Sequence, residues 1–199
     1  MEYKTKALTY KGCKQGDKKH KEIIDGYNKM KTLPRGYKVK YSDDWCATFV
    51  SFILYSCNAK NPPCECSVPK MWAKAKKNKQ IVNTPKINDV IVYDWGNNGT
   101  LDHVGIIYNV KGNTLYVIEG NKSNACGTRT ISKNSNVVHG FIRVPQNTTT
   151  VKKKKTNTEI AKEVIKGKYG NGDTRKKAIE KLGYNYSEIQ KIVNELKSK

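Results

Sequence analysis

The sequence has no long apolar segment, which excludes one class of protein at once. None of its 199 residues belongs to a run of about 18 consecutive apolar residues, the length that a membrane-spanning helix needs. The first residues, Met-Glu-Tyr-Lys-Thr-Lys, also lack the apolar segment of a secretory signal peptide. We therefore expect no membrane span, and we expect the chain to stay in the cytoplasm in which it is made until another factor releases it.

Arginine is scarce although positive charge is abundant. The net charge is +21, yet only four of the 38 basic residues are arginine. Arginine is the side chain whose planar fork best reads guanine and phosphate, so nucleic acid is not the expected partner. Lysine spread along the whole chain instead favours a general attraction to polyanions, including anionic lipids and acidic cell-wall polymers. A coding bias toward lysine would explain the same excess without any partner.

The cysteines match no common zinc-binding pattern. Cys64-Glu-Cys66 leaves a gap of one residue, which is tighter than the usual two to four residues of zinc sites. We therefore expect no metal from these residues, and without a signal peptide a disulfide framework is also disfavoured. The six residues are expected to be mostly free thiols: Cys13, Cys46, Cys57, Cys64, Cys66 and Cys126.

Helical patterns dominate the first half of the chain. The predicted helices cover residues of about 20–30, 44–57 and 71–79. In the second of these, aromatic and aliphatic residues recur at helical spacing, which predicts a buried helix. Its N-cap candidates stand directly before the apolar positions and are Ser42, Asp43 and Asp44.

Strand patterns follow after residue 83. Short alternating or continuous apolar runs predict five strands, at residues 89–95, 103–110, 114–119, 127–132 and 140–144. Helices followed by an antiparallel meander predict an α+β fold.

The last quarter of the chain is separated from the rest by a basic, polar stretch. Residues 146–157 have no apolar periodicity and contain four consecutive lysines, which indicates a linker. Three short helical stripes then return between residues 158 and 197. We therefore predict a domain at 1–145, a linker at 146–157 and a small three-helix module at 158–199.

One cysteine and one histidine stand where thiol chemistry would need them. Cys46 lies at the first turn of a buried helix, where unpaired backbone N–H groups favour the thiolate. His103 begins an apolar strand and is the best candidate for a catalytic base. His20 lies in a lysine-rich helix and is expected on the surface, whereas His139 is ambiguous.

The next strand offers a partner for the histidine. With a three-residue loop at 111–113, Glu119 faces Gly105 and lies on the same side of the sheet as His103. A two-residue loop would put Glu119 on the opposite face, unless a bulge compensated. In the first register either Glu119 or Asn121 can accept the ring N–H and so orient the imidazole.

Four blocks of sequence resemble one known family: Asp44-Trp-Cys-Ala-Thr-Phe-Val-Ser51, Asn88-Asp-Val-Ile-Val-Tyr-Asp-Trp95, Asp102-His-Val-Gly-Ile-Ile107 and Val117-Ile-Glu-Gly-Asn121. Together they resemble CHAP domains, the cysteine, histidine-dependent amidohydrolases/peptidases. The resemblance implies a papain-like fold in which Cys46 is the nucleophile, His103 is the base, and Glu119 and Asn121 complete the site. Some CHAP domains bind calcium through an acidic loop before the cysteine. Only two aspartates stand there in this chain, so no metal or other cofactor is expected.

The C-terminal segment resembles a second family. Residues 158–196 are similar to CW-seven-type repeats, three-helix modules that bind peptidoglycan in phage lysins, although Tyr169 stands where that family usually has tryptophan. The resemblance indicates wall-binding candidates, which are Tyr169, Asn171, Arg175 and Tyr184. At least one of the tyrosines is instead expected to fill the small core. Only one repeat is present, so avidity would require an oligomer.

These resemblances imply a phage endolysin that hydrolyses bacterial peptidoglycan. Such an enzyme would wait in the host cytoplasm until a holin-type pore releases it to the wall. The residues do not distinguish an N-acetylmuramoyl-L-alanine amidase from a peptidoglycan endopeptidase, since in both reactions the thiolate attacks an amide bond of the substrate. Two other classes remain as alternatives: a catalytically silent protein that binds walls or polyanions, and a nucleic-acid-binding protein driven by charge.

Overall fold

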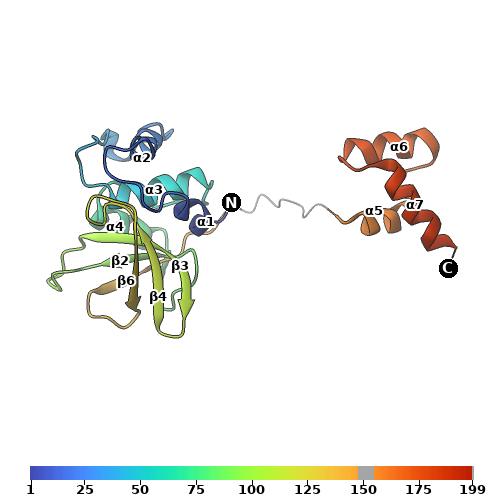
Figure 1. The fold of residues 1–199 in the computed structure, drawn as a ribbon. Helices are drawn as coiled ribbons and strands as arrows, with labels where there is room; N and C mark the ends of the chain where they lie inside the picture. The colour runs from blue at the N-terminus through green and yellow to red at the C-terminus, as the bar shows by residue number, and fades with distance from the viewer. Residues whose placement is uncertain (148–154, 199) are drawn as a thin grey trace. The chain divides into compact units, whose positions relative to one another are not determined.

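The computed structural model describes residues 1–147 and 155–198, and these form two compact units (Figure 1). The described residues contain seven α-helices and one six-stranded antiparallel sheet, which confirms the predicted α+β fold. Most of the predicted linker, residues 148–154, lies outside the described residues. Of its two ends, Gln146 bridges to Ala59 in the N-terminal unit and Thr156 caps the first helix of the C-terminal unit.

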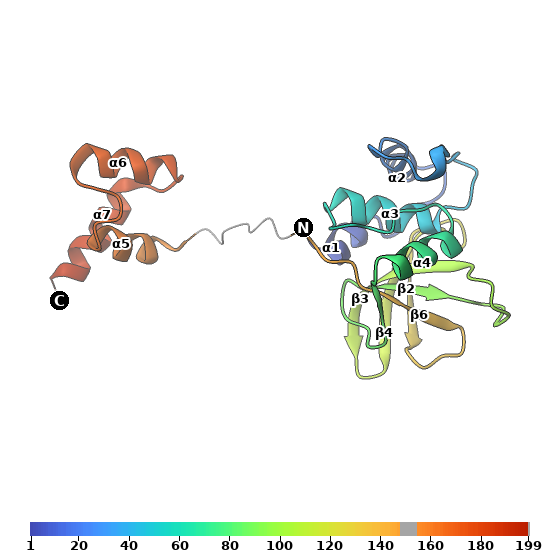
Figure 2. The same ribbon diagram turned by 180° about the vertical axis from the view of Figure 1, so that it is seen from behind.

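The helices of the N-terminal unit gather on one side of its sheet (Figures 1 and 2). The central one, α3, packs against β3 and β4, and every residue from Cys46 to Leu54 is buried. Its neighbours cover it from the solvent side, so it is buried all round, as its largely apolar sequence requires. The helices are α1 (Tyr3–Leu8), α2 (Lys18–Asn28), α3 (Cys46–Ser56) and α4 (Val68–Lys77), with a 3-10 turn at Pro34–Gly36.

The prediction that His20 lies on the surface is wrong. His20 is fully buried and its ring packs edge-on against Trp45, with 4.9 Å between the ring centroids. The buried residues of α2 are His20, Ile23, Ile24 and Tyr27, which is helical spacing for a single face. The lysines of this helix lie on its exposed face, so the helix is amphipathic and His20 belongs to its buried face.

Helix α3 begins later than predicted, and none of the three N-cap candidates caps it. Its N-cap residue is Trp45, without a side-chain cap. The Asp43 carboxylate instead accepts hydrogen bonds from the Lys40 N–H and the Tyr37 hydroxyl, and Asp44 accepts one from Asn121. Tertiary partners therefore use the oxygens that local sequence assigned to the helix end.

The sheet is not a simple meander. Its order is β1-β6-β2-β3-β4-β5, so β2 to β5 form a meander, but β6 returns to pair with β2. All four residues of β2 are buried, and the return of β6 pairs an edge that would otherwise be left open inside the protein. The strands are β1 (Ile81–Val82), β2 (Val90–Tyr93), β3 (His103–Lys111), β4 (Thr114–Glu119), β5 (Gly127–Ser132) and β6 (Val138–Ile142).

A β-bulge gives the β3–β4 hairpin the register that places Glu119 on the same face of the sheet as His103. Lys111 pairs with Thr114, so the loop has two residues and the predicted three-residue loop is wrong. A register shift between Ile107 and Asn109 then inserts one extra residue, and Gly105 pairs with Glu119 beyond it. The bulge restores Glu119 to the face that carries His103.

Gly120 lets the end of β4 approach α3. A Cβ atom placed on Gly120 would lie 2.5 Å from Cβ of Phe49 and 2.8 Å from its Cγ. Phe49 is fully buried and lies one turn after Cys46, so it cannot move away cheaply. This close contact brings the strand that ends in Glu119 against the helix that begins at Cys46.

The C-terminal unit has its own small core. Helices α5 (Asn157–Ile165), α6 (Gly172–Lys181) and α7 (Tyr186–Lys197) enclose a separate cluster of buried aliphatic side chains. A capping box formed by Thr156 and Glu159 begins α5. The cluster consists of Ile160, Ala161, Val164, Ile179, Ile189 and Val193.

Substitution of Gly120 by alanine tests the close approach. We expect Gly120→Ala to lower the free energy of unfolding by about 1–3 kcal/mol, because the added methyl group overpacks a rigid contact. Gly127→Ala is the matched control, since its Cβ would meet only the flexible side chain of Lys122. Urea unfolding measures both. A Gly120→Ala protein as stable as the Gly127→Ala protein would contradict this account.

Candidate functional site

Cys46 is the first residue of α3, and its side chain is buried. The first turn closes with the Phe49 N–H donating to the Trp45 carbonyl. The N–H groups of the residues between them therefore have no partner within the helix. This is the setting that sequence analysis predicted for a reactive cysteine.

His103 is the first residue of β3 and pairs with Tyr93 at the end of β2. Its imidazole stacks on the Tyr93 ring, with the centroids 5.8 Å apart and the planes inclined by 25°. Its Nε2 atom lies 3.3 Å from Oε2 of Glu119, an ion-pair contact, and neither atom has a hydrogen-bond partner among the described residues. Nδ1 is therefore the ring nitrogen that remains available to exchange a proton with Cys46.

Glu119 is fully buried at the end of β4. Its second oxygen, Oε1, accepts a hydrogen bond of 2.8 Å from Nε of Arg129 on β5. Burial by itself raises the pKa of this carboxyl, but hydrogen bonds and charge from His103 and Arg129 outweigh burial and hold the pKa below its usual value. Glu119 is thus an ionised carboxylate, with Oε2 facing His103 and Oε1 bound by Arg129.

The protonation of His103 links the thiol to the carboxylate. Burial by itself lowers the pKa of His103, but side-chain hydrogen bonds and charge from Cys46 and Glu119 outweigh it and raise the pKa to about 9. At neutral pH the histidine is therefore an imidazolium between two acidic groups. The structure brings Cys46, His103 and Glu119 together from α3, β3 and β4.

Asn121 takes a different place from the one expected for an alternative partner of His103. Its backbone is left-handed, with a φ of 56°, and its side-chain Nδ2 donates a hydrogen bond of 2.8 Å to Oδ1 of Asp44. Its Oδ1 is buried and has no hydrogen-bond partner in the part of the chain that the structure describes. Glu119 is the side chain that lies against the imidazole, while Asn121 ties the end of β4 to the segment before α3.

Sequence reasoning missed three side chains around this cluster: Tyr93, Trp95 and Arg129. The Trp95 and Tyr93 rings stack with centroids 4.7 Å apart, and the Arg129 guanidinium lies 4.4 Å from the Trp95 centroid. Both aromatic residues stand in a block that had been singled out, so they could have been found. Arg129 could not, because its position depends on the pairing of β4 with β5.

No group of three or more histidine, cysteine or acidic side chains is arranged to hold a metal ion within residues 1–147 and 155–198. One carboxylate oxygen of each aspartate before the cysteine, Asp43 and Asp44, accepts hydrogen bonds from protein donors. All six cysteines are free thiols in the structure. In the same described ranges, no helix has the length and apolar character to cross a membrane.

The candidate wall-binding residues form two groups in the C-terminal unit. Arg175 donates from Nε to the Gly170 carbonyl and from a terminal nitrogen to Oδ1 of Asn171, at 3.0 and 2.6 Å. Arg175 and Asn171 therefore hold the turn before α6 in shape. A third contact, of 3.5 Å, reaches Gln190 on α7.

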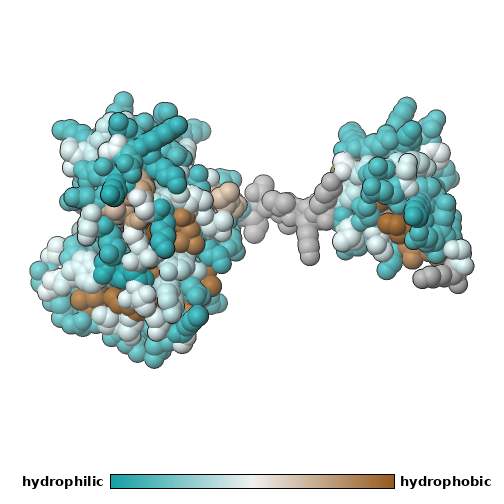
Figure 3. Space-filling view, in the orientation of Figure 1, coloured by the Kyte–Doolittle hydropathy of each residue, from teal (hydrophilic) through white to brown (hydrophobic). Residues whose placement is uncertain are grey.

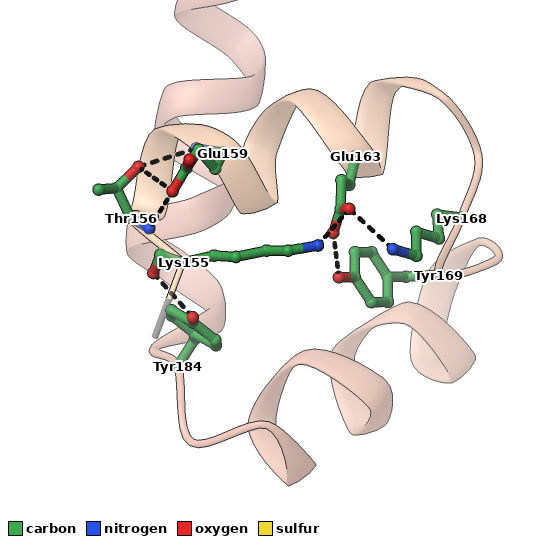
Figure 4. A network of polar contacts seen from close by, with 7 residues as sticks. All are labelled: Lys155, Thr156, Glu159, Glu163, Lys168, Tyr169 and Tyr184. Atoms are coloured by element: carbon green, nitrogen blue, oxygen red, sulfur yellow. Dashed lines mark hydrogen bonds and ion pairs between the residues drawn. The ribbon is translucent and has the colours of Figure 1, made fainter. Parts of the chain in front are cut away.

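The tyrosines belong to the second group (Figure 4). The Tyr169 hydroxyl donates a hydrogen bond of 2.6 Å to Glu163, which also pairs with Lys155 and Lys168. The Tyr184 hydroxyl donates to the Lys155 carbonyl, at 2.7 Å. Both rings are half-buried against the core of the unit, so they also serve as packing residues, as expected for at least one of them.

A buried helix that begins with a cysteine and packs on an antiparallel sheet carrying a histidine is the architecture of papain-like thiol hydrolases. A family model of the CHAP domain matches residues 36–121, and a family model of the CW_7 repeat matches residues 158–196. The chain therefore contains a CHAP domain followed by a CW_7 repeat. The first indicates a peptidoglycan amidase/peptidase family and the second cell-wall binding. A search of curated proteins finds no match to this sequence.

Titration of His103 tests the coupling of the site. Its pKa lies above the ordinary value of about 6.5, so the imidazolium stabilises the fold fully below that pH, and this stabilisation is lost as the pH rises through about 9. We expect NMR titration to place His103 near 9 in the wild type and clearly lower in Cys46→Ala. Cys57→Ala, at the other end of the same helix, should leave the titration unchanged. Equal midpoints in all three proteins would show that the thiol and imidazole are not coupled.

Proposed function

We propose that this protein is a peptidoglycan hydrolase of the endolysin type, which cleaves an amide bond of the stem peptide or its cross-bridge. The observation that carries the proposal is the meeting of Cys46, His103 and Glu119 in a chain that also has a cell-wall-binding repeat. The rise in the pKa of His103 supports a thiolate–imidazolium pair, the form in which a cysteine attacks an amide without a separate activation step.

The first half of the reaction forms a thioester. The Cys46 sulfur attacks the amide carbonyl carbon, and the carbonyl oxygen becomes an oxyanion. The unpaired N–H at the start of α3 is a candidate donor to that oxygen. As the C–N bond breaks, the imidazolium of His103 gives its proton to the leaving nitrogen, so the amine departs neutral.

The second half restores the enzyme. Neutral His103 takes a proton from a water molecule, and the resulting hydroxide attacks the thioester carbonyl. The C–S bond breaks, the carboxylic acid product leaves and loses its proton to the solvent, and the thiolate is recovered beside the imidazolium. Glu119 orients the imidazole by binding Nε2, which keeps Nδ1 directed to the sulfur and the substrate.

The C-terminal unit would keep the enzyme at its substrate. Cell-wall binding by the CW_7 repeat raises the local concentration of the hydrolase at the polymer. The net charge of +21 adds an attraction to anionic wall polymers that weakens as salt rises. One repeat gives one contact, so an oligomer would bind more tightly.

Purified cell walls test the catalytic proposal. We expect the wild type to reduce wall turbidity and release new amino groups without new reducing sugar ends, because an amide and not a glycosidic bond is cut. Cys46→Ala should lose this activity by at least about 100-fold, since the residue forms the covalent intermediate. Cys57→Ala is the matched control and should keep full activity. The identity of the freed N-terminus separates an amidase from an endopeptidase.

Two outcomes would overturn the mechanism. Equal lysis by Cys46→Ala and wild type would exclude the thiol as nucleophile. Wall binding without lysis in the wild type would favour the catalytically silent alternative, in which only the C-terminal unit acts.

Arg175 provides a test of the wall-binding unit. Arg175→Ala removes the hydrogen bonds that shape the turn at Gly170 and Asn171, so we expect several-fold weaker sedimentation with purified walls. Lys177→Ala removes the same charge from an exposed position of α6 and should bind almost normally. Hydrolysis of soluble muropeptides should be unchanged in both. Equal losses of binding in the two variants would reduce the role of Arg175 to its charge.

A further inference from the structure

The surroundings of Glu119 contain a cation that the reaction scheme does not use. Arg129 lies on β5 opposite Val117, and this register places it on the same sheet face as Glu119. Its Nε donates a hydrogen bond of 2.8 Å to Oε1, while Oε2 of the same carboxylate faces His103 at 3.3 Å. Arg129 therefore decides which oxygen is left for the histidine.

The other side of the guanidinium is also held. It lies 4.4 Å from the centroid of Trp95, a ring that is 38% exposed, and 5.9 Å from that of Tyr93. Trp95 stacks on Tyr93 and Tyr93 stacks on His103. Arg129 thus contacts both groups that hold the His103 ring in place. These are the Glu119 carboxylate on one side and the stacked rings of Tyr93 and Trp95 on the other.

We propose that Arg129 is a positioning residue that keeps Glu119 ionised and oriented when His103 has given up its proton. The inference rests on the proposed function, in which His103 passes its proton to the leaving amine. At that point neutral His103 no longer balances the carboxylate. A fully buried carboxylate without a counter-charge would take up a proton instead, and among the described residues only Arg129 supplies a permanent positive charge in contact with it.

The charged and titratable groups around Glu119 all bear on this proposal. They are His103 of β3, Arg129 of β5 and Tyr93 of β2, with Cys46 of α3 beyond the histidine. The Tyr93 hydroxyl stays protonated, because burial and the neighbouring carboxylate raise its pKa. Arg129 is therefore the single group of this set whose positive charge does not change during turnover.

Loss of Arg129 has two opposed effects on His103. Removing a nearby positive charge would raise the pKa of the imidazole. Protonation of an unsupported Glu119 would lower it, because a neutral carboxyl no longer stabilises the imidazolium. The proposal requires the second effect to be larger, since Arg129 touches Glu119 directly. A purely structural role would leave only the first effect, so the His103 midpoint would stay the same or rise.

The experiment compares full-length Arg129→Met, Arg129→Lys and Arg143→Met with the wild type. Arg143 is the matched control, because it forms a similar ion pair with the buried Asp89, at 2.7 and 3.0 Å, at the other end of β2. For each protein, NMR titration gives the His103 midpoint, wall hydrolysis gives kcat/KM against pH, and thermal unfolding gives stability.

We expect Arg129→Met to lower the His103 midpoint by about one pH unit, a tenfold change in its protonation equilibrium. We expect kcat/KM to fall by on the order of 100-fold through loss of orientation, and the alkaline limb of the pH profile to move to lower pH. Arg129→Lys keeps the charge and should restore most of the midpoint but less of the rate, because lysine lacks the planar fork. Arg143→Met should lose stability without moving the midpoint.

An unchanged or higher His103 midpoint in Arg129→Met would overturn the proposal, as would an equal shift in Arg143→Met. The titration does not depend on the substrate. If the wild type failed to hydrolyse walls, the proposed function would fall, and the midpoints would still decide whether Arg129 supports the Glu119–His103 pair.

Discussion

A single buried carboxylate organises the N-terminal unit. Glu119 has no exposed surface, and a charge in that position is tolerated only because both of its oxygens meet cationic partners. Those partners come from two different neighbouring strands, so the carboxylate is stable only when the sheet is correctly paired. Because Glu119 needs both cationic partners, β3, β4 and β5 must be paired in the correct register for the site to form.

The close packing of glycines extends the same constraint to the helix. Gly105 lies opposite Glu119, and a Cβ there would come within 2.8 Å of the glutamate Cγ. Gly120 follows Glu119 and lets the strand touch Phe49 of α3. One glycine leaves room for the carboxylate on the sheet, and the other lets the sheet reach the helix that carries Cys46. The two glycines thus bring the strand that ends in Glu119 against α3, which begins at Cys46.

The two units place their charged groups differently. In the N-terminal unit the Glu119 carboxylate is fully buried, while the C-terminal unit keeps its ion pairs at the surface around Glu163 (Figure 4). The face drawn in Figure 3 is largely hydrophilic in both units, with small apolar areas between polar residues. Surface ion pairs stabilise little, so the small aliphatic core and the capping box carry the stability of the C-terminal unit.

Local sequence was sufficient for the helix that begins near Cys46 and for the strands that begin at His103 and end at Glu119. Periodicity and chemistry act over a few positions, and they needed no knowledge of the fold. The tertiary structure alone decided the bulge between Ile107 and Asn109, because a two-residue turn and a one-residue insertion compensate each other across the hairpin. It also decided the return of β6 to β2, the burial of His20 and the contact of Arg129 with Glu119. These features depend on which distant segments face each other, and a pairing between strands leaves no periodic mark in either strand alone.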